Sequence, residues 1–281
     1  MMLAPFFLFF ACFVLYPILR SILDSFTNYD LIKKEFVGLD NYFRLFRDKT
    51  FVRSIWNTLI YAICSIVPLM ALGLMAAVLV NRQTKAMFAA RAILMYPYVT
   101  SMVAVSMVWM YMYDPNNGIF NKLLQAVGLN IQKFLYDPKQ ALWCLIIMNI
   151  WKYLGYVMII YLAALQGVSK DLYEAASIDG AGSWRQLLSI TLPGIRPISY
   201  FLMTTLCVEC FKTFDQVRLM TNGGPVNATS TITYQIYMRA FSEFKMGYAS
   251  AMSVVLLLII LVITLINLKV GHQLDDEGGR N

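Results

Sequence analysis

The sequence EAASIDGAGSWRQLLSITLPGIRP, residues Glu174–Pro197, is a polar segment placed between two long apolar stretches. At its start, Asp171 and Glu174 have the spacing of a capping box, in which two side chains three residues apart bond reciprocally to backbone N–H groups. This spacing predicts a short helix that begins at Asp171. The dipeptide Asp179-Gly180 predicts the turn that ends the helix, because both residues favour turns and glycine adopts left-handed backbone readily.

A second short helix is predicted after this turn. Ser183 and Gln186 repeat the capping spacing, and Pro193 is expected to break the helix because proline lacks a backbone N–H. The segment as a whole predicts a helix-turn-helix on one membrane face, which favours contact with a soluble partner. An ordinary interfacial helix is the alternative.

Composition places the rest of the chain in the bilayer. Of its 281 residues, 59% are hydrophobic and 14% are charged, whereas charged residues make up about a quarter of soluble proteins. Because alternating strands are absent and unpaired backbone is not tolerated in lipid, we expect an all-α integral membrane protein with six transmembrane helices in a single domain, residues 1–281. The six apolar stretches lie near 2–19, 57–80, 92–113, 141–165, 198–217 and 249–269.

The sequence lacks the residue patterns that nucleotide binding, metal binding and catalysis usually require. No G-x-x-x-x-G-K-[ST] pattern occurs, so a nucleotide is not expected to bind in the usual P-loop manner. The five cysteines fall in the predicted spans without metal spacing, and the single histidine, His272, stands in a polar tail without ligand partners. We therefore expect no metal, no cofactor and no catalytic residue in this chain. The net charge of +7 is spread over both faces, which indicates no nucleic-acid partner.

Several motifs at fixed spacing carry a resemblance to a known family. In the polar segment they are Glu174, Ala175, Ala176, Asp179, Gly180, Ala181, Ile190, Leu192, Pro193 and Pro197. This pattern closely resembles the cytoplasmic signature of ABC-importer permease subunits. Four further stretches resemble permeases of the carbohydrate-uptake group (maltose, oligosaccharide and glycerol-phosphate importers), and more narrowly the first of their two non-identical permeases. These stretches are Gly38–Phe46, Ser54–Tyr61, Tyr96–Asn121 and Thr221–Phe241.

The resemblance implies the transmembrane subunit of a binding-protein-dependent importer that moves a sugar or oligosaccharide inward by alternating access. It implies as partners a second permease, two P-loop ATPase subunits that carry ATP and Mg, an extracytoplasmic solute-binding protein and membrane lipid. The chain itself is then not expected to be an enzyme. Residues 166–197 would form the cytoplasmic coupling loop, with Glu174, Ala175, Ala176, Asp179, Gly180, Ala181, Leu192 and Pro193 as the ATPase-coupling residues.

Orientation rests on the resemblance alone. It implies that the coupling loop and both termini lie on the cytoplasmic side of a bacterial or archaeal cell membrane. The positive-inside rule points the other way, since seven Lys and Arg residues lie in 20–53 and three in 81–91.

Polar side chains at membrane depth mark a candidate solute pathway, because they are costly in lipid and usually face a cavity or one another. In the fourth stretch they recur at the spacing of one helical face, and in the fifth they share a broad face with a cysteine. The candidate solute-binding residues are Asn149, Lys152, Tyr153 and Tyr156, together with Glu209, Cys210, Lys212 and Thr213. Amide, phenol and hydroxyl groups beside aromatic rings suit a sugar.

The resemblance places sugar contacts of the maltose-type permease on five of these residues, Asn149, Tyr153, Tyr156, Cys210 and Thr213. Tyr153, Cys210 and Thr213 depart from the family pattern, so the same sugar in the same pose is not implied.

For the charged residues a structural alternative stays open. Glu209, Lys212 and Asp215 are spaced three apart, so they would satisfy one another if they paired within one helix. Lys152 and Lys212 would instead suit an anionic solute, such as a uronic acid or a phosphorylated glycerol.

Other functions fit the sequence less well. A secondary transporter would show inverted halves, and the six stretches show no obvious ones. A membrane-embedded enzyme would need paired carboxylates, a metal cluster or a nucleophile with a base, and no histidine lies in the predicted spans. An importer permease for an amino acid or a metal stays open, although the outer-loop resemblance favours a sugar.

Overall fold

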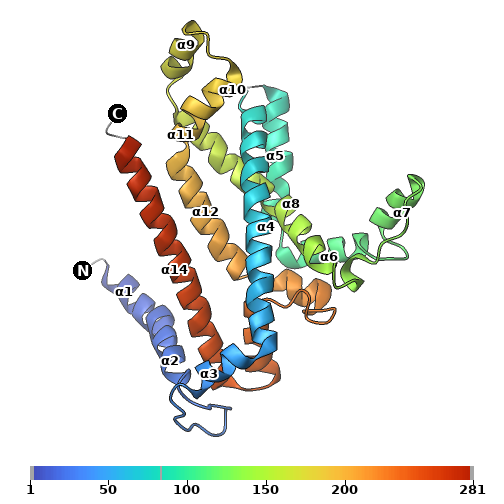
Figure 1. The fold of residues 1–281 in the computed structure, drawn as a ribbon, viewed down its shortest axis with the longest axis vertical. Coiled ribbons are helices and arrows are strands. Elements are labelled where there is room, and N and C mark those ends of the chain that lie inside the picture. Colours follow the sequence, from blue (N-terminus) through green and yellow to red (C-terminus); the bar gives the residue numbers. More distant parts are fainter. Residues whose placement is uncertain (1–2, 83, 279–281) are drawn as a thin grey trace.

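The computed structural model describes residues 3–82 and 84–278, with side chains as far as residue 271. Within these residues the chain is helical apart from its loops and one isolated β-bridge between Thr27 and Phe36. Figure 1 shows long helices running side by side, with a short helix pair beyond one end. The helices are α1 Ala4–Phe10, η1 Ala11–Leu15, α2 Tyr16–Asp24, α3 Asp40–Arg47, α4 Lys49–Val80, α5 Lys85–Val99, α6 Met102–Met112, α7 Ile119–Ala126, η2 Phe134–Tyr136, α8 Ala141–Gly167, α9 Lys170–Ile178, α10 Ser183–Gln186, η3 Leu187–Thr191, α11 Leu192–Gly194, α12 Arg196–Phe211, η4 Val217–Thr221, α13 Ile232–Tyr237, η5 Met238–Ser242 and α14 Met246–Gly278.

Four continuous helices in the described residues are long and apolar enough to cross a membrane, and they confirm the prediction of an all-α membrane protein. They are Ala4–Asp24, Lys49–Val80, Ala141–Gly167 and Met246–Gly271. The count of spans in the described residues rises to five if the bent pair α5 and α6 is taken as one broken span, and α12 with its 16 residues is shorter than the others. Residue 2, where the first predicted stretch begins, lies outside the described residues.

The prediction of one straight helix over 92–113 is wrong. α5 ends at Val99, and α6 leaves it at an angle of 97°. Thr100 and Ser101 between them adopt extended backbone, and Pro97 removes one N–H from the last turn of α5. The Thr100 hydroxyl donates to the Tyr96 carbonyl at 3.0 Å, which partly compensates for the interrupted ladder.

The stretch 198–217 is also interrupted, because α12 ends at Phe211. Two hydroxyls from the segment that starts α13 donate hydrogen bonds to backbone carbonyls at this interruption. Thr233 donates to the Phe211 carbonyl at 2.8 Å, and Thr231 donates to the Thr213 carbonyl at 3.1 Å. These two bonds give the Phe211 and Thr213 carbonyls a partner where the helix stops.

Helix α8 lies at the centre of the bundle, packed against α4, α5 and α12. Two glycines permit its closest contacts. A Cβ atom on Gly155 would lie 2.0 Å from the carbonyl oxygen of Leu94 in α5, and a Cβ on Gly73 of α4 would lie 2.5 Å from Cγ1 of Val157. Small residues of this kind let helix backbones approach closely in membranes, where dispersion forces drive association. Both contacts fix the position of α8.

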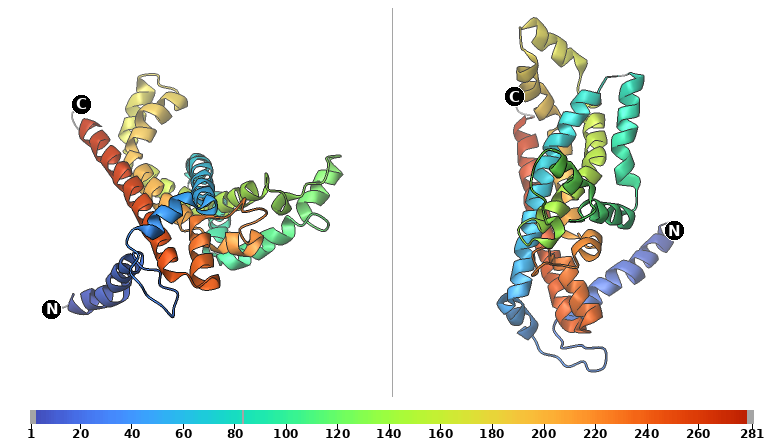
Figure 2. Two further views of the ribbon diagram at one scale, coloured as in Figure 1. Left: turned by 60° about the horizontal axis from the view of Figure 1, so that its bottom comes forward. Right: turned by 90° about the vertical axis from the view of Figure 1, so that its right-hand side faces the viewer.

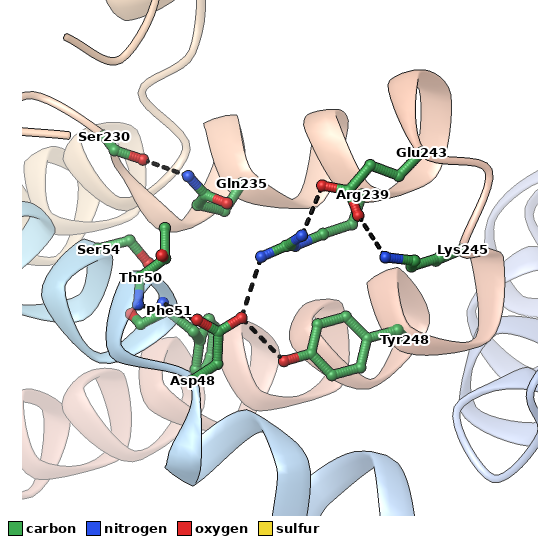
Figure 3. Close-up of polar contacts among 10 residues, drawn as sticks. All are labelled: Asp48, Thr50, Phe51, Ser54, Ser230, Gln235, Arg239, Glu243, Lys245 and Tyr248. Carbon is green, nitrogen blue, oxygen red and sulfur yellow. Dashed lines mark hydrogen bonds and ion pairs between the residues drawn. The ribbon is translucent and has the colours of Figure 1, made fainter. Parts of the chain in front are cut away.

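At the far end of the bundle from α9, one carboxylate joins three elements (Figure 3). Asp48 accepts from the backbone N–H groups of Thr50 and Phe51, at 2.8 and 3.4 Å, and so caps α4. Its other oxygen accepts from Arg239 Nη2 at 3.0 Å and from the Tyr248 hydroxyl at 3.2 Å. The start of α4 is therefore tied to η5 and to α14.

Glu243 extends this cluster, since it pairs with Arg239 and with Lys245. The hydrogen bond from Arg239 lowers the pKa of Glu243 below its ordinary value. Glu243 therefore contributes stability above its ordinary pKa, and that contribution is lost as the pH falls through the lowered pKa. Glu243 therefore keeps its negative charge at neutral pH.

The first predicted span stands apart from the bundle. No residue of Ala4–Asp24 except the last turn is even half-buried, and α2 packs mainly against α14. Figures 1 and 2 show α1 and α2 splayed away from the other helices. A long apolar helix thus presents almost its whole surface to the surroundings of this chain.

The close approach of α5 and α8 gives a testable prediction. Gly155→Ala is expected to destabilise the chain by about 1–3 kcal/mol, because the added methyl group forces the α5 backbone away from α8. The thermal unfolding midpoint in mild detergent measures the effect. Gly167→Ala is the control, since a Cβ there meets nothing within 4 Å. Equal midpoints for the two variants would contradict the packing described here.

Candidate solute site and coupling loop

The first helix of the polar segment is α9, and its boundaries correct the predicted cap. Ser169, not Asp171, is the N-cap, and its hydroxyl accepts from the Asp171 N–H at 3.3 Å. The predicted capping box of Asp171 and Glu174 is therefore wrong. Serine caps a helix as well as aspartate does, and the helix starts one residue before Asp171.

The predicted end of α9 is confirmed. Gly180 has a φ of +77°. The Ala181 N–H donates to the Ala176 carbonyl at 2.8 Å, and the Gly180 N–H donates to the Ser177 carbonyl at 3.1 Å. These two bonds form a Schellman motif, which satisfies the last carbonyls of the helix. The turn between the two helices is thus fixed by its own backbone.

The second helix differs from its prediction at both ends. Gly182 is the N-cap and makes no side-chain bond, so Ser183 does not cap the helix. Gln186 instead donates to the Ser177 hydroxyl at 2.9 Å and to the Ala181 carbonyl at 3.1 Å, which ties α10 to α9. Pro193 does not end the helix either. A wide π-turn, η3, precedes it, and Pro193 lies in the first turn of α11, where a missing N–H costs nothing.

The helix pair is also attached at its base, where the Tyr173 and Thr191 hydroxyls are 3.0 Å apart. A pocket of about 920 Å³ lies between the pair and the ends of α4 and α8. Large apolar side chains on the pair face outward, with Ile178 87% and Trp184 72% exposed. Of the predicted coupling residues, Ala176 and Ala181 are half-buried, and the exposed ones are Glu174, Ala175, Asp179, Gly180, Leu192 and Pro193. The structure brings all of them together on one projecting element (Figure 1).

A second cluster lies within the bundle, on α8. The ring of Tyr98, from the last turn of α5, stacks on Tyr156 with centroids 4.8 Å apart and meets Tyr153 edge-on at 5.6 Å. Glu209 of α12 is close enough to act electrostatically on both α8 phenols. All four side chains are partly accessible. Tyr98 was not among the predicted residues, and the Pro97 break beside it is the signal that could have found it.

Asn149 lies two turns before Tyr156 on the same helix. It is only 4% exposed, yet its side-chain amide makes no hydrogen bond with any described residue. Its amide is not among the fully enclosed polar atoms that lack a partner, so some of it is accessible from outside. Asn149 therefore stays a candidate for contact with a polar solute.

Lys152 has a different environment from the one predicted for it. It is 4% exposed, and its ammonium group donates to the carbonyls of Pro97, Tyr98 and Thr100 at 3.1, 3.3 and 2.7 Å. These carbonyls lie at and just beyond the end of α5, where the helical ladder stops, and a cation is favoured at the negative end of a helix. The geometry favours a structural role for Lys152, in which it also holds Tyr98 beside Tyr156.

The candidate residues beyond the start of α12 divide into two groups. Cys210 and Thr213 are buried, and Thr213 accepts from Gln216, which also donates to the Tyr61 hydroxyl at 2.9 Å. The charged group, Glu209, Lys212 and Asp215, is exposed. The predicted common helical face does not form, because the helix stops at Phe211. None of the ion pairs in the described residues includes these three charges, so the alternative of pairing within one helix is wrong.

No group of three or more metal-ligating side chains occurs within the described residues. The five cysteines are all free. Cys144, Cys207 and Cys210 are buried, whereas Cys12 is exposed on the first span.

Comparison with known proteins gives consistent matches. A family model described as the inner membrane component of binding-protein-dependent transport systems matches residues 69–272. The sn-glycerol-3-phosphate transport system permease protein UgpA of Yersinia pestis is 32% identical, over 92% of this chain and 88% of the relative. The arabinooligosaccharides transport system permease protein AraP of Bacillus subtilis is 31% identical, over 98% of this chain and 88% of the relative.

A solved structure is similar over nearly the whole chain. It is the crystal structure of a bacterial alginate ABC transporter in complex with an alginate pentasaccharide-bound periplasmic protein. One of its chains superposes with a TM-score of 0.84 at 26% sequence identity, over 95% of this chain and 91% of that chain. The interrupted helices and the projecting helix pair therefore belong to an architecture seen experimentally.

The contacts of Lys152 give a second prediction. Lys152→Met is expected to destabilise the chain by about 1–3 kcal/mol, because it leaves buried carbonyls without a donor. Lys152→Arg should recover part of the loss. Lys212→Met is the control, since Lys212 is exposed and forms no ion pair with a described residue. Thermal unfolding in detergent compares the variants, and equal midpoints for the two methionine variants would argue against the capping role.

Proposed function

The chain belongs to the inner-membrane components of binding-protein-dependent transport systems, and on that premise we propose that it is the transmembrane subunit of an importer for a sugar or oligosaccharide. One observation carries the proposal. A single helix, α8, holds Asn149, Tyr153 and Tyr156 and then leads through Ser169 directly into the projecting helix α9. From Tyr156 to Ser169 the helix rises about 20 Å. A displacement of α9 therefore moves the candidate solute site.

The partner at the projecting pair is proposed to be an ATPase. The sequence has no P-loop pattern of its own, so the nucleotide chemistry is assigned to two partner subunits that bind ATP and Mg. Glu174 and Asp179 supply exposed charge, and Ile178 and Trp184 supply exposed apolar surface. Such a mixed surface suits docking into a cleft of a soluble protein. The rigid Schellman turn would transmit motion without bending.

The solute class is proposed from the cluster on α8. The Asn149 amide offers hydrogen bonds to hydroxyl groups, and the rings of Tyr98, Tyr153 and Tyr156 on the same part of the bundle offer flat surfaces to a sugar C–H face. The names of the relatives support this class, because they include an arabinooligosaccharide permease and an alginate transporter. We propose Asn149, Tyr98, Tyr153 and Tyr156 as contacts. Glu209 is a further candidate, and we leave out Lys152, Cys210 and Thr213 because their side chains are committed to the fold.

An anionic solute is the second candidate. Lys212 is exposed close to Glu209 and forms no ion pair with a described residue, so its charge is available to an acidic sugar or a phosphorylated glycerol. A glycerol-3-phosphate permease among the relatives supports this alternative.

We further propose a second permease, a solute-binding protein and a defined orientation. The exposed apolar helix Ala4–Asp24 suits contact with a neighbouring subunit in the membrane. The ends of α4 and α8 and the projecting pair share one face (Figure 1), which is proposed to be cytoplasmic in a bacterial or archaeal cell membrane, together with both termini. The binding protein would deliver solute at the opposite face.

Glu174→Lys tests the docking proposal. The variant is expected to insert normally but to recover at least tenfold less ATPase subunit when the tagged chain is purified from its own membranes, because the charge on the docking surface is reversed. Quantitative mass spectrometry of the co-purified proteins measures this. Glu35→Lys makes the same charge change on the opposite face and should leave ATPase recovery unchanged. Normal ATPase recovery and normal uptake with Glu174→Lys would refute the coupling role.

Asn149→Leu tests the solute site. Because the amide has no partner among the described residues, its loss should not lower the thermal midpoint, whereas uptake should fall at least tenfold if the amide binds solute. The assay uses membrane vesicles loaded with ATP and a panel of labelled arabinose and alginate oligosaccharides and glycerol 3-phosphate. Asn130→Leu, in an exposed outer loop, is the matched control. Unchanged uptake together with a lowered midpoint would make Asn149 a packing residue.

A further inference from the structure

Where α3 meets α4, the surface carries an uncompensated positive charge. A pocket of about 350 Å³ is lined by Phe46, Arg47, Lys49, Val52, Arg53 and Trp56, and we call these six residues the basic elbow. No carboxylate lines this pocket. Lys49, Arg53 and Trp56 follow the i, i+4, i+7 spacing, so they share one face of α4.

The three cations of the basic elbow have no partner within the described residues. All are exposed, and none takes part in an ion pair. The nearest carboxylate in sequence, Asp48, is engaged with Arg239, Tyr248 and the backbone N–H groups of α4 (Figure 3). Three like charges around one pocket repel one another, and an anion in the pocket would relieve that repulsion.

The same face of α4 continues into the membrane as an apolar stripe. Ile60, Ile63 and Val67 are exposed and follow Trp56 at helical spacing. The opposite face of α4, which carries Tyr61 and Leu69, is buried in the bundle. From Arg53 to Val67 the stripe runs about 21 Å.

This sequence of features matches one class of ligand. Along α4 from its N-terminal end, the cations come first and the exposed Trp56 follows. Aromatic rings favour the headgroup level of a membrane, and beyond Trp56 the helix surface is apolar. A phospholipid has the same order of chemistry, with an anionic phosphate, a glycerol region and acyl chains. A zwitterionic headgroup would bring its own cation into a pocket that already holds three.

We propose that the basic elbow binds the headgroup of an anionic phospholipid, whose acyl chain lies along Ile60, Ile63 and Val67. The bound lipid would neutralise the cations where α4 enters the membrane. The Asp48 cluster would hold the pocket open, because it keeps the neighbouring carboxylate turned away from the three cations.

The test measures lipid retained by the full chain. Wild-type protein is reconstituted in vesicles of equal parts phosphatidylglycerol and phosphatidylcholine and re-extracted in mild detergent, and mass spectrometry quantifies both lipids per chain. The elbow variant, R47Q/K49Q/R53Q, removes the three cations. The matched control, K122Q/K133Q/K139Q, removes three exposed cations from the loop before α8 and makes the same change in net charge.

The expected result is enrichment of phosphatidylglycerol on wild type and on the control, and a loss of about tenfold or more on the elbow variant. The single variant Arg53→Gln should give a partial loss, and it serves if the triple variant fails to fold. The proposal is overturned by equal retention on wild type and elbow variant, by equal loss on elbow variant and control, or by no preference over phosphatidylcholine. Unchanged lipid retention with lost binding to an acidic protein would also overturn it.

Discussion

Where α5 stops, the Lys152 ammonium donates to the carbonyls of Pro97, Tyr98 and Thr100. In a membrane no water is at hand to replace a missing hydrogen bond, so an interrupted span needs an internal donor. Because that donor comes from α8, the break in one helix is tied to the position of another. The stacking of Tyr98 on Tyr156 and the sharp departure of α6 both follow from this attachment.

Helix α8 therefore unites features that are far apart in the molecule. Gly155 allows the close approach of α5, and Lys152 donates hydrogen bonds to carbonyls at the end of α5. Asn149, Tyr153 and Tyr156 belong to the candidate solute site. The last residue of α8 lies three positions before α9. The Schellman motif and the bonds of Gln186 make the helix pair stiff, and the pair joins α8 through a short extended link, Val168 and Ser169.

Sequence reasoning succeeded where the controlling forces are local. Apolar length predicted the helices, and Asp179-Gly180 predicted the end of α9 from the preference of glycine for left-handed backbone. Sequence reasoning failed where contacts with residues distant in the sequence determine where a helix ends. The break after Val99 depends on a lysine more than fifty residues away, and the end of α12 depends on hydroxyls of Thr231 and Thr233. For the same reason Lys152 was assigned to solute, whereas its hydrogen-bond partners are carbonyls.

The separation of α1 and α2 from the bundle has a consequence for how the chain is made. This span is synthesised before the central helices, and its main packing partner, α14, is synthesised after them. Until α14 is made, α2 has no such neighbour, while the central contacts of α4, α5 and α8 can already form. The contact between α2 and α14 therefore closes late in synthesis and joins helices that are far apart in the sequence.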